Sequence, residues 1–129
     1  MASESLRRFR KIRRRETLDE VIRTGEVART PYFRVCYLTG EGPPGVAILA
    51  GRKVGGAVKR NRAKRVLREA LRTSTADLSG IETLIFIASG RAADARYSDI
   101  RTTLHEELRR ISDRDSRSGN EAGQDGGPR

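Results

Sequence analysis

Residues 51–69 read GRKVGGAVKRNRAKRVLRE, and this stretch is the most informative feature of the chain. Nine of the 21 residues from Arg52 to Arg72 are Lys or Arg, and only Glu69 opposes them. Apolar residues recur at helical spacing from residue 57 onward, which predicts a helix over residues 57–72. Its buried stripe would consist of Ala63, Val66, Leu67, Ala70 and Leu71.

The opposite face of this helix is strongly cationic. At about 100° per residue it carries Asn61, Lys64, Arg65, Arg68 and Arg72, with Arg60 and Arg62 on the two flanks. A solvated helix normally mixes Glu with Lys at i, i+4 to relieve repulsion, and this one does not. The pattern therefore favours a polyanionic ligand over a merely solvated face.

Two kinds of nucleic acid compete as that ligand. A DNA recognition helix would expect a helix and a short turn before it, whereas the preceding segment has strand composition. RNA binding through backbone and shape is therefore favoured. Gly51, Gly55 and Gly56 precede the helix N-terminus, where free amides favour an anion. Neither a Walker loop nor a dinucleotide fingerprint is present.

The bulk composition agrees with a small RNA-binding domain. The 129 residues suggest one domain, and 36% hydrophobic residues without any Trp predict a small, mostly aliphatic core. The net charge of +10 indicates nucleic acid as partner, with an acidic membrane surface second. No apolar run approaches the roughly 18 residues of a membrane span, and no secretory signal is apparent. We therefore expect a cytoplasmic protein without a membrane partner.

The sequence offers little to a protein-borne catalytic or metal site. Cys36 is the only cysteine, which excludes an internal disulfide and a thiolate zinc site of the usual kind; it reads as a buried apolar filler. His105 is the only histidine and lies beside Glu106 and Glu107, which favours a surface role. We expect no catalytic residue, no directly bound metal and no small-molecule cofactor.

The segments before the basic helix predict a short helix and two strands. Thr17 and Glu20 form a capping-box pattern that predicts a helix over residues 17–24, ended by Gly25. Residues 32–38 and 46–50 have strand composition and are separated by a turn rich in Gly and Pro, so they are predicted to form an antiparallel hairpin.

After the basic helix, residues 83–88 predict a central strand, which makes a strand–helix–strand crossover. Ser98 is the expected cap of a last helix. We divide the chain into a basic N-terminal arm (1–15), an RNA-binding domain (16–112) and a disordered tail (113–129). The arm would offer Arg10, Lys11, Arg13 and Arg14 to an RNA backbone.

Residues 53–69 also resemble a known signature. Lys53-Val54-Gly55, then Ala57-Val58, then Arg60-Asn61-Arg62-x-Lys64-Arg65-x-x-Arg68-Glu69 closely resemble the motif of the bacterial ribonuclease P protein subunit. The order of the other segments, from residue 6 to residue 111, is similar to that of this family. The remaining alternative is a structural, ribosomal-type RNA-binding protein without a role in cleavage.

The resemblance implies a fold and an activity. The fold is a single-domain α/β (α+β) sandwich with a central, mostly antiparallel sheet and a left-handed βαβ crossover, similar to the ribosomal-protein S5 domain 2-like fold. The partners are the catalytic RNA of ribonuclease P and precursor tRNA. The protein is the accessory subunit of an endoribonuclease whose catalytic centre, with bound Mg²⁺, lies in the RNA and removes the 5′ leader.

The resemblance also implies two sets of site residues. RNA contacts would come from Arg52, Lys53, Lys59, Arg60, Asn61, Arg62, Lys64, Arg65, Arg68 and Arg72. A leader cleft between the first helix and the sheet would be walled by Leu18, Ile22, Arg34, Cys36 and Lys53. Many relatives carry aromatic residues on this first helix and the adjacent strand, whereas Leu18, Ile22 and Cys36 offer no ring for stacking.

Overall fold

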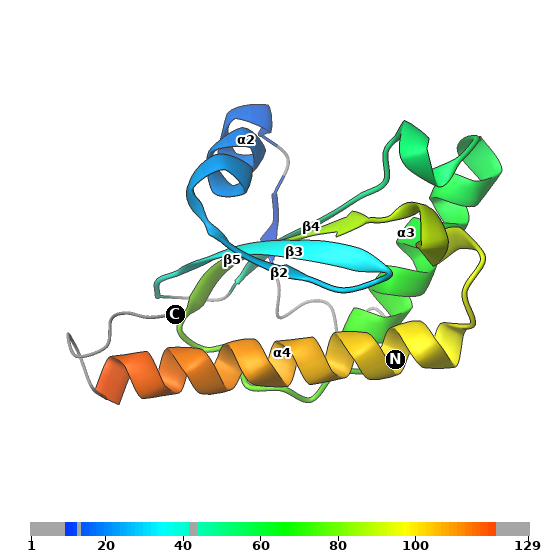
Figure 1. Ribbon diagram of the computed structural model, residues 1–129. Coiled ribbons are helices and arrows are strands. Elements are labelled where there is room, and N and C mark those ends of the chain that lie inside the picture. Colours follow the sequence, from blue (N-terminus) through cyan, green and yellow to red (C-terminus); the bar gives the residue numbers. More distant parts are fainter. Residues whose placement is uncertain (1–9, 13, 42–43, 121–129) are drawn as a thin grey trace.

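The computed structural model describes residues 10–12, 14–41 and 44–120 and contains one mixed sheet (Figure 1). The strand order is β1-β4-β5-β3-β2. The strands are β1 (Arg10–Lys11), β2 (Glu26–Arg29), β3 (Phe33–Thr39), β4 (Gly45–Leu49) and β5 (Ile81–Ala88). The helices are α2 (Arg15–Thr24), α3 (Ala57–Arg72) and α4 (Tyr97–Asn120), with 3-10 turns η1 (Arg52–Val54) and η2 (Gly90–Ala93).

The sheet separates two hydrophobic clusters, which makes the fold a sandwich. The larger cluster lies between the sheet and the helices α3 and α4, and includes an edge-to-face pair of Phe33 and Phe86 with ring centroids 5.7 Å apart. The smaller cluster lies under α2 on the other face and contains Val21, Cys36 and Ile85. The α+β sandwich expected from the sequence is therefore confirmed.

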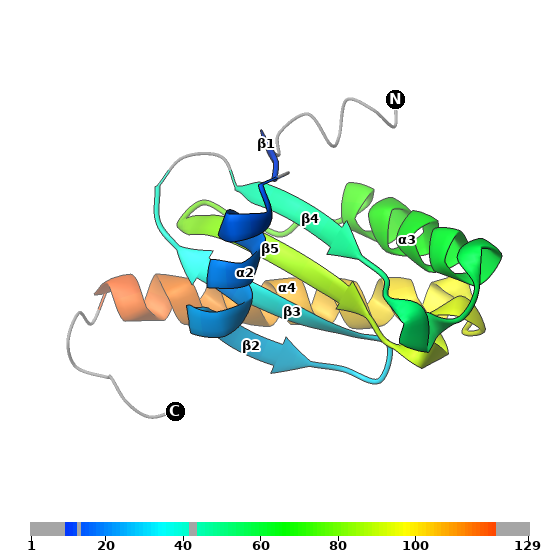
Figure 2. The same ribbon diagram turned by 90° about the horizontal axis from the view of Figure 1, so that it is seen from above.

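The basic helix has the bounds that its periodicity predicts. α3 runs from Ala57 to Arg72, and all five residues of the predicted stripe are buried against the larger cluster. β4 and β5 are parallel, so the strand–helix–strand crossover is also confirmed. In Figure 2 both strands point to the right, β5 lies below β4, and α2 is on the viewer's side of the sheet. Because α3 packs on the larger cluster, on the face opposite α2, the crossover is left-handed.

The predicted hairpin is wrong. β3 and β4 do not pair with each other, because β5 lies between them, antiparallel to β3 and parallel to β4. The composition of a strand predicts that it is buried, but not which strands it pairs with. β5 is apolar on both faces, which suits the centre of the sheet. β2 was not predicted either, because its Glu26–Arg29 segment is mostly exposed at the sheet edge.

The start of the first helix also differs from the prediction. α2 begins at Arg15, two residues before Thr17, and Arg14 is its N-cap without a side-chain hydrogen bond, so the capping box does not form. Gly25 does end the helix. Its φ is ordinary, and it is required for space: a Cβ there would lie 2.7 Å from the backbone oxygens of Val21 and Tyr37.

The last helix starts earlier and ends later than expected. The Arg96 carbonyl accepts from the amides of Asp99 and Ile100, so α4 begins at Tyr97 and Ser98 lies inside its first turn. The backbone is helical through Asn120, so α4 extends into the segment from residue 113 that the sequence predicts to be a tail, and no proline interrupts it there. Residues 121–129 lie outside the described part.

Part of the expected N-terminal arm belongs to the sheet. Arg10 and Lys11 form β1, which pairs in parallel with Gly45 and Val46 at the start of β4. The charge of this segment predicts an arm, but charge does not exclude a short edge strand whose main chain hydrogen-bonds to β4. Residues 1–9 and Arg13 lie outside the described residues.

Candidate nucleic-acid interface

The side of α3 that faces away from the core holds a row of side chains that we call the α3 basic face: Asn61, Lys64, Arg65 and Arg68. Asn61, Arg65 and Arg68 are exposed, and Lys64 is half-buried. The helix is held rigidly from below by the fully buried Leu67 and Leu71. Arg65 and Arg68 are one turn apart, about 4.5 Å along the helix axis.

The cations of this face have no carboxylate partner within the described residues. The ion pairs there join Lys59 to Asp94, Arg72 to Glu69 and Arg110 to Glu107, and none involves Lys64, Arg65 or Arg68. Arg60, half-buried on the flank, is also outside these pairs. Unrelieved like charges on a helix destabilise it, so this face is suited to a ligand that carries negative charge.

The turn before α3 adds two more exposed cations. Val54 is buried and anchors η1, so Arg52 and Lys53 on the same turn are directed outward. Gly55 has φ 137°, which a side chain rarely adopts, and it redirects the chain into α3. Arg52 and Lys53 thereby extend the cationic surface beyond the N-terminus of the helix.

Arg62, one of the expected RNA contacts, makes hydrogen bonds within the protein. Its guanidinium donates to the backbone oxygens of Ala93 (2.6 Å), Ala92 (3.4 Å) and Ala95 (3.4 Å), and so fixes the segment between η2 and α4. The sequence placed Arg62 on the flank of the helix, but it could not show that free carbonyls would lie opposite. Arg62 is thus a structural clamp, with both of its terminal nitrogens bonded to backbone carbonyls.

We expect Arg62→Ala to lower the free energy of unfolding by about 1–3 kcal/mol, because the carbonyls at the end of η2 lose their charged donor. Thermal or urea unfolding of the variant measures this loss. Arg65→Ala is the matched control: it also removes one cation from α3, but it breaks no described hydrogen bond and is expected to change stability little. Equal stability of the two variants would contradict the clamp.

Two further expected contacts are engaged within the protein. Arg72 donates to both carboxylate oxygens of Glu69, which lowers the pKa of Glu69 and keeps it charged beside Arg72. Lys59 lies 3.9 Å from Asp94, with more than half of each side chain exposed. Such an exposed pair is weak and can be exchanged for a phosphate.

The expected leader-cleft residues are divided between surface and interior. Leu18 and Ile22 of α2 are half-buried against the smaller cluster, Arg34 is half-buried on β3, and Lys53 is exposed. Cys36 has no exposed surface, so it cannot wall a cleft as expected, although its predicted role as an apolar filler is confirmed. Its burial raises the pKa of the thiol, an effect that nearby Arg34 and Arg29 partly offset.

His105 links the two helices that cover the larger cluster. Its Nε2 lies 2.9 Å from the Ala70 oxygen and 3.1 Å from Thr73 Oγ1, at the C-terminal end of α3. The side chain is half-buried, so His105 lies at the surface but also packs against the end of α3. Spacing along α4 alone did not reveal this contact, because it depends on where α3 ends.

Neither a metal site nor a membrane span is found in the part of the chain that the structure describes. There, no three His, Cys, Asp or Glu side chains gather in a group that could hold a metal ion. No described helix is both long and apolar enough to cross a bilayer.

The fold and this surface together define a basic, single-sheet α/β protein with an exposed cationic helix face. The family model described as Ribonuclease P matches residues 6–112, and the chain belongs to this family. The family places the protein as a component of the ribonucleoprotein endoribonuclease that processes tRNA.

The similar proteins are ribonuclease P protein components. The chain is 36% identical over 113 residues to the ribonuclease P protein component of Xanthomonas euvesicatoria, covering 84% of this chain and 77% of the relative. It is 27% identical over 101 residues to that of Syntrophus aciditrophicus, covering 78% and 85%.

Solved structures show the same fold. The ribonuclease P protein of Thermotoga maritima superposes with a TM-score of 0.67 at 24% identity, covering 78% of this chain and 96% of that one. The protein from Staphylococcus aureus gives 0.66 at 23%, covering 79% and 94%.

Proposed function

We propose that this chain binds the catalytic RNA of ribonuclease P through the α3 basic face and assists removal of the 5′ leader from precursor tRNA. The observation that carries the proposal is a set of three cations, Lys64, Arg65 and Arg68, that form no ion pair with the described residues, on a helix whose other side is fixed in the core. A preformed cationic surface neutralises closely spaced phosphates and releases their counterions, at little cost in ordering the protein.

The side chains of the protein suggest which steps the protein carries out and which the RNA carries out. The described residues hold no acidic cluster for a metal, so we assign Mg²⁺ and the nucleophile to the RNA, and binding and positioning to the protein. Arg34, Lys53 and the exposed parts of Leu18 and Ile22 are the proposed contacts of the leader. The enzyme that results would act in the cytoplasm, where precursor tRNA is processed.

Reconstitution tests this function directly. The measurement is cleavage of a precursor tRNA by the ribonuclease P RNA of the same organism at low Mg²⁺, with and without the full-length protein. We expect cleavage at the mature 5′ end to depend on the protein, because added cations replace part of the screening that Mg²⁺ supplies. Tight RNA binding without any rescue of cleavage would instead support a purely structural RNA-binding protein.

A further inference from the structure

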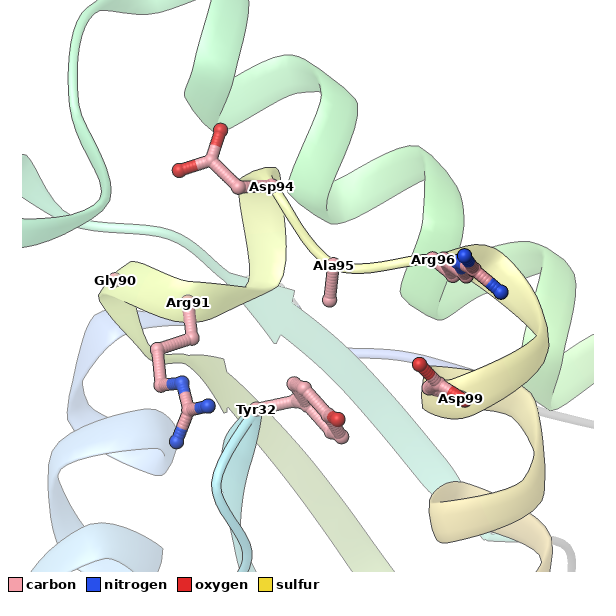
Figure 3. Close-up of a pocket in the computed structure, with 7 residues that line it drawn as sticks. All are labelled: Tyr32, Gly90, Arg91, Asp94, Ala95, Arg96 and Asp99. Atoms are coloured by element: carbon pink, nitrogen blue, oxygen red, sulfur yellow. The ribbon is translucent and has the colours of Figure 1, made fainter.

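A pocket of about 520 Å³ lies beside the proposed interface, between the β2–β3 turn and the segment that joins η2 to α4 (Figure 3). Its lining differs from the α3 basic face, because both signs of charge surround an aromatic ring. Tyr32 supplies the ring, Arg91 and Arg96 supply cations, and Asp94 and Asp99 supply carboxylates. Its volume is in the range of small-ligand sites.

Tyr32 is one of few rings in the described chain that a ligand can reach. Phe33, Tyr37 and Phe86 are at most 4% exposed in the larger cluster. Tyr32 and Tyr97 are half-buried, with part of each ring against that cluster, and only Tyr32 lines the pocket. Stacking of a base, if this protein uses it, therefore has its best platform at Tyr32.

The walls of the pocket are held in place before any ligand arrives. The Ser89 amide donates to the Tyr32 oxygen (2.9 Å), and the Ser89 hydroxyl donates to the Pro31 oxygen (2.7 Å). Thr30 Oγ1 accepts from the amides of Tyr32 and Phe33. On the opposite wall, Arg62 fixes the carbonyls of the segment before α4. Binding to such a preorganised site loses little conformational entropy.

The charges around the ring suit one kind of ligand. Arg91 and Asp99 flank Tyr32 on opposite sides, whereas Asp94 points away toward α3, where Lys59 is near it (Figure 3). A carboxylate accepts hydrogen bonds, so Asp99 suits a ligand that has donors, and Arg91 suits a phosphate. A nucleotide has both hydrogen-bond donors, on the edge of its base, and a phosphate. The Watson–Crick edge of guanine presents adjacent N–H donors.

We propose that this pocket binds one unpaired RNA nucleotide, preferentially guanosine, with its base stacked on Tyr32, its edge on Asp99 and its phosphate on Arg91. The pocket adjoins the proposed leader contacts, because a Cβ at Gly90 on its rim would lie 3.1 Å from the Lys53 oxygen. The inference rests on the proposed function only for the source of the nucleotide, which is the precursor leader or a single-stranded part of the catalytic RNA.

The first test uses the full-length protein alone, so it does not depend on cleavage. Guanosine 5′-monophosphate, uridine 5′-monophosphate and inorganic phosphate are titrated at constant ionic strength, while NMR follows the ring signals of Tyr32. We expect saturable shifts with guanosine monophosphate, weaker binding of the uridine nucleotide and no ring shift with phosphate. Unshifted Tyr32 signals, or equal shifts with phosphate, would overturn the proposal.

Variants separate stacking from a loss of folding. Tyr32→Phe keeps the ring and should retain binding, whereas Tyr32→Leu should weaken it about 5- to 150-fold, the range expected for one stacked base. Asp99→Asn, at an exposed position, should abolish the preference for guanine over uracil. Equal affinities of the Phe and Leu variants, with both proteins folded by circular dichroism, would contradict stacking.

The reconstituted holoenzyme then identifies the source. If the nucleotide is in the leader, Tyr32→Leu weakens binding of precursor tRNA with a leader but not of tRNA without one. If it is in the catalytic RNA, the variant weakens assembly of the holoenzyme and leaves the leader dependence unchanged. Normal assembly and normal leader dependence would overturn the RNA assignment, and a wild-type protein that binds nucleotides without supporting cleavage would reject the proposed function alone.

Discussion

Arg65→Ala combined with Arg68→Ala is expected to weaken binding of the ribonuclease P RNA about a hundredfold. Each arginine is exposed, without a carboxylate partner among the described residues, and positioned by a helix that is buried on its other side. A hydrogen bond to a charged group contributes about 1.5 kcal/mol at the low end, so losing two costs about 3 kcal/mol. The slope of log K against log salt should also decrease, by up to about 1.8.

Filter binding or anisotropy at several salt concentrations measures both quantities. Arg15→Ala with Arg23→Ala is the matched control, because it removes the same charge from exposed positions of α2, across the sheet from α3. We expect the control to change affinity and slope less. Equal losses in the two double variants would mean that net charge, and not the α3 basic face, determines binding.

Leu67→Ala is expected to destabilise the protein by about 2–5 kcal/mol, a large part of the 5–15 kcal/mol that stabilises a typical domain. Leu67 has no exposed surface and is packed in the larger cluster, beside residues of the sheet and α4. Removing its side chain leaves a cavity under the α3 basic face. Chemical denaturation, with the midpoint and slope both fitted, measures the loss.

The neighbouring residue provides the control for this prediction. Arg68→Ala changes an exposed side chain on the same helix and is expected to leave stability nearly unchanged while weakening RNA binding. Leu67→Ala should thus lower the free energy of unfolding, whereas Arg68→Ala should lower the salt-dependent affinity for RNA. If Arg68→Ala were as destabilising as Leu67→Ala, the division of α3 into a buried and a binding face would be wrong.

The sequence predicted α3 fully and the sheet only in part, for a physical reason. Helical periodicity is a local property, so Ala57–Arg72 and its buried stripe followed from spacing alone. Strand pairing is not local: β5 lies between β3 and β4, although 31 residues of chain separate the end of β4 from the start of β5. No periodicity of apolar residues along the chain indicates that β5 lies between β3 and β4.

The candidate site shows the same division. Exposure of Arg65 and Arg68 followed from their angle around the helix. The clamp of Arg62 and the contact of His105 did not, because each depends on backbone carbonyls that another segment brings close. The sequence predicts Tyr32 only as the start of a strand, because the charges around it come from η2 and α4, about 60 residues later in the chain.

The central position of β5 has a consequence for how the chain matures on the ribosome. β3 and β4 find their shared partner only when the segment up to Ala88 has emerged, so the sheet cannot close before two thirds of the chain has been made. Until then the apolar β4 segment has no strand on the side that β5 will occupy, and unpaired strand edges promote association between chains. The cations that follow at once in η1 and α3 place strong charge repulsion beside it, as gatekeeper residues do. The same positive charges would thus protect the nascent protein before they meet any RNA.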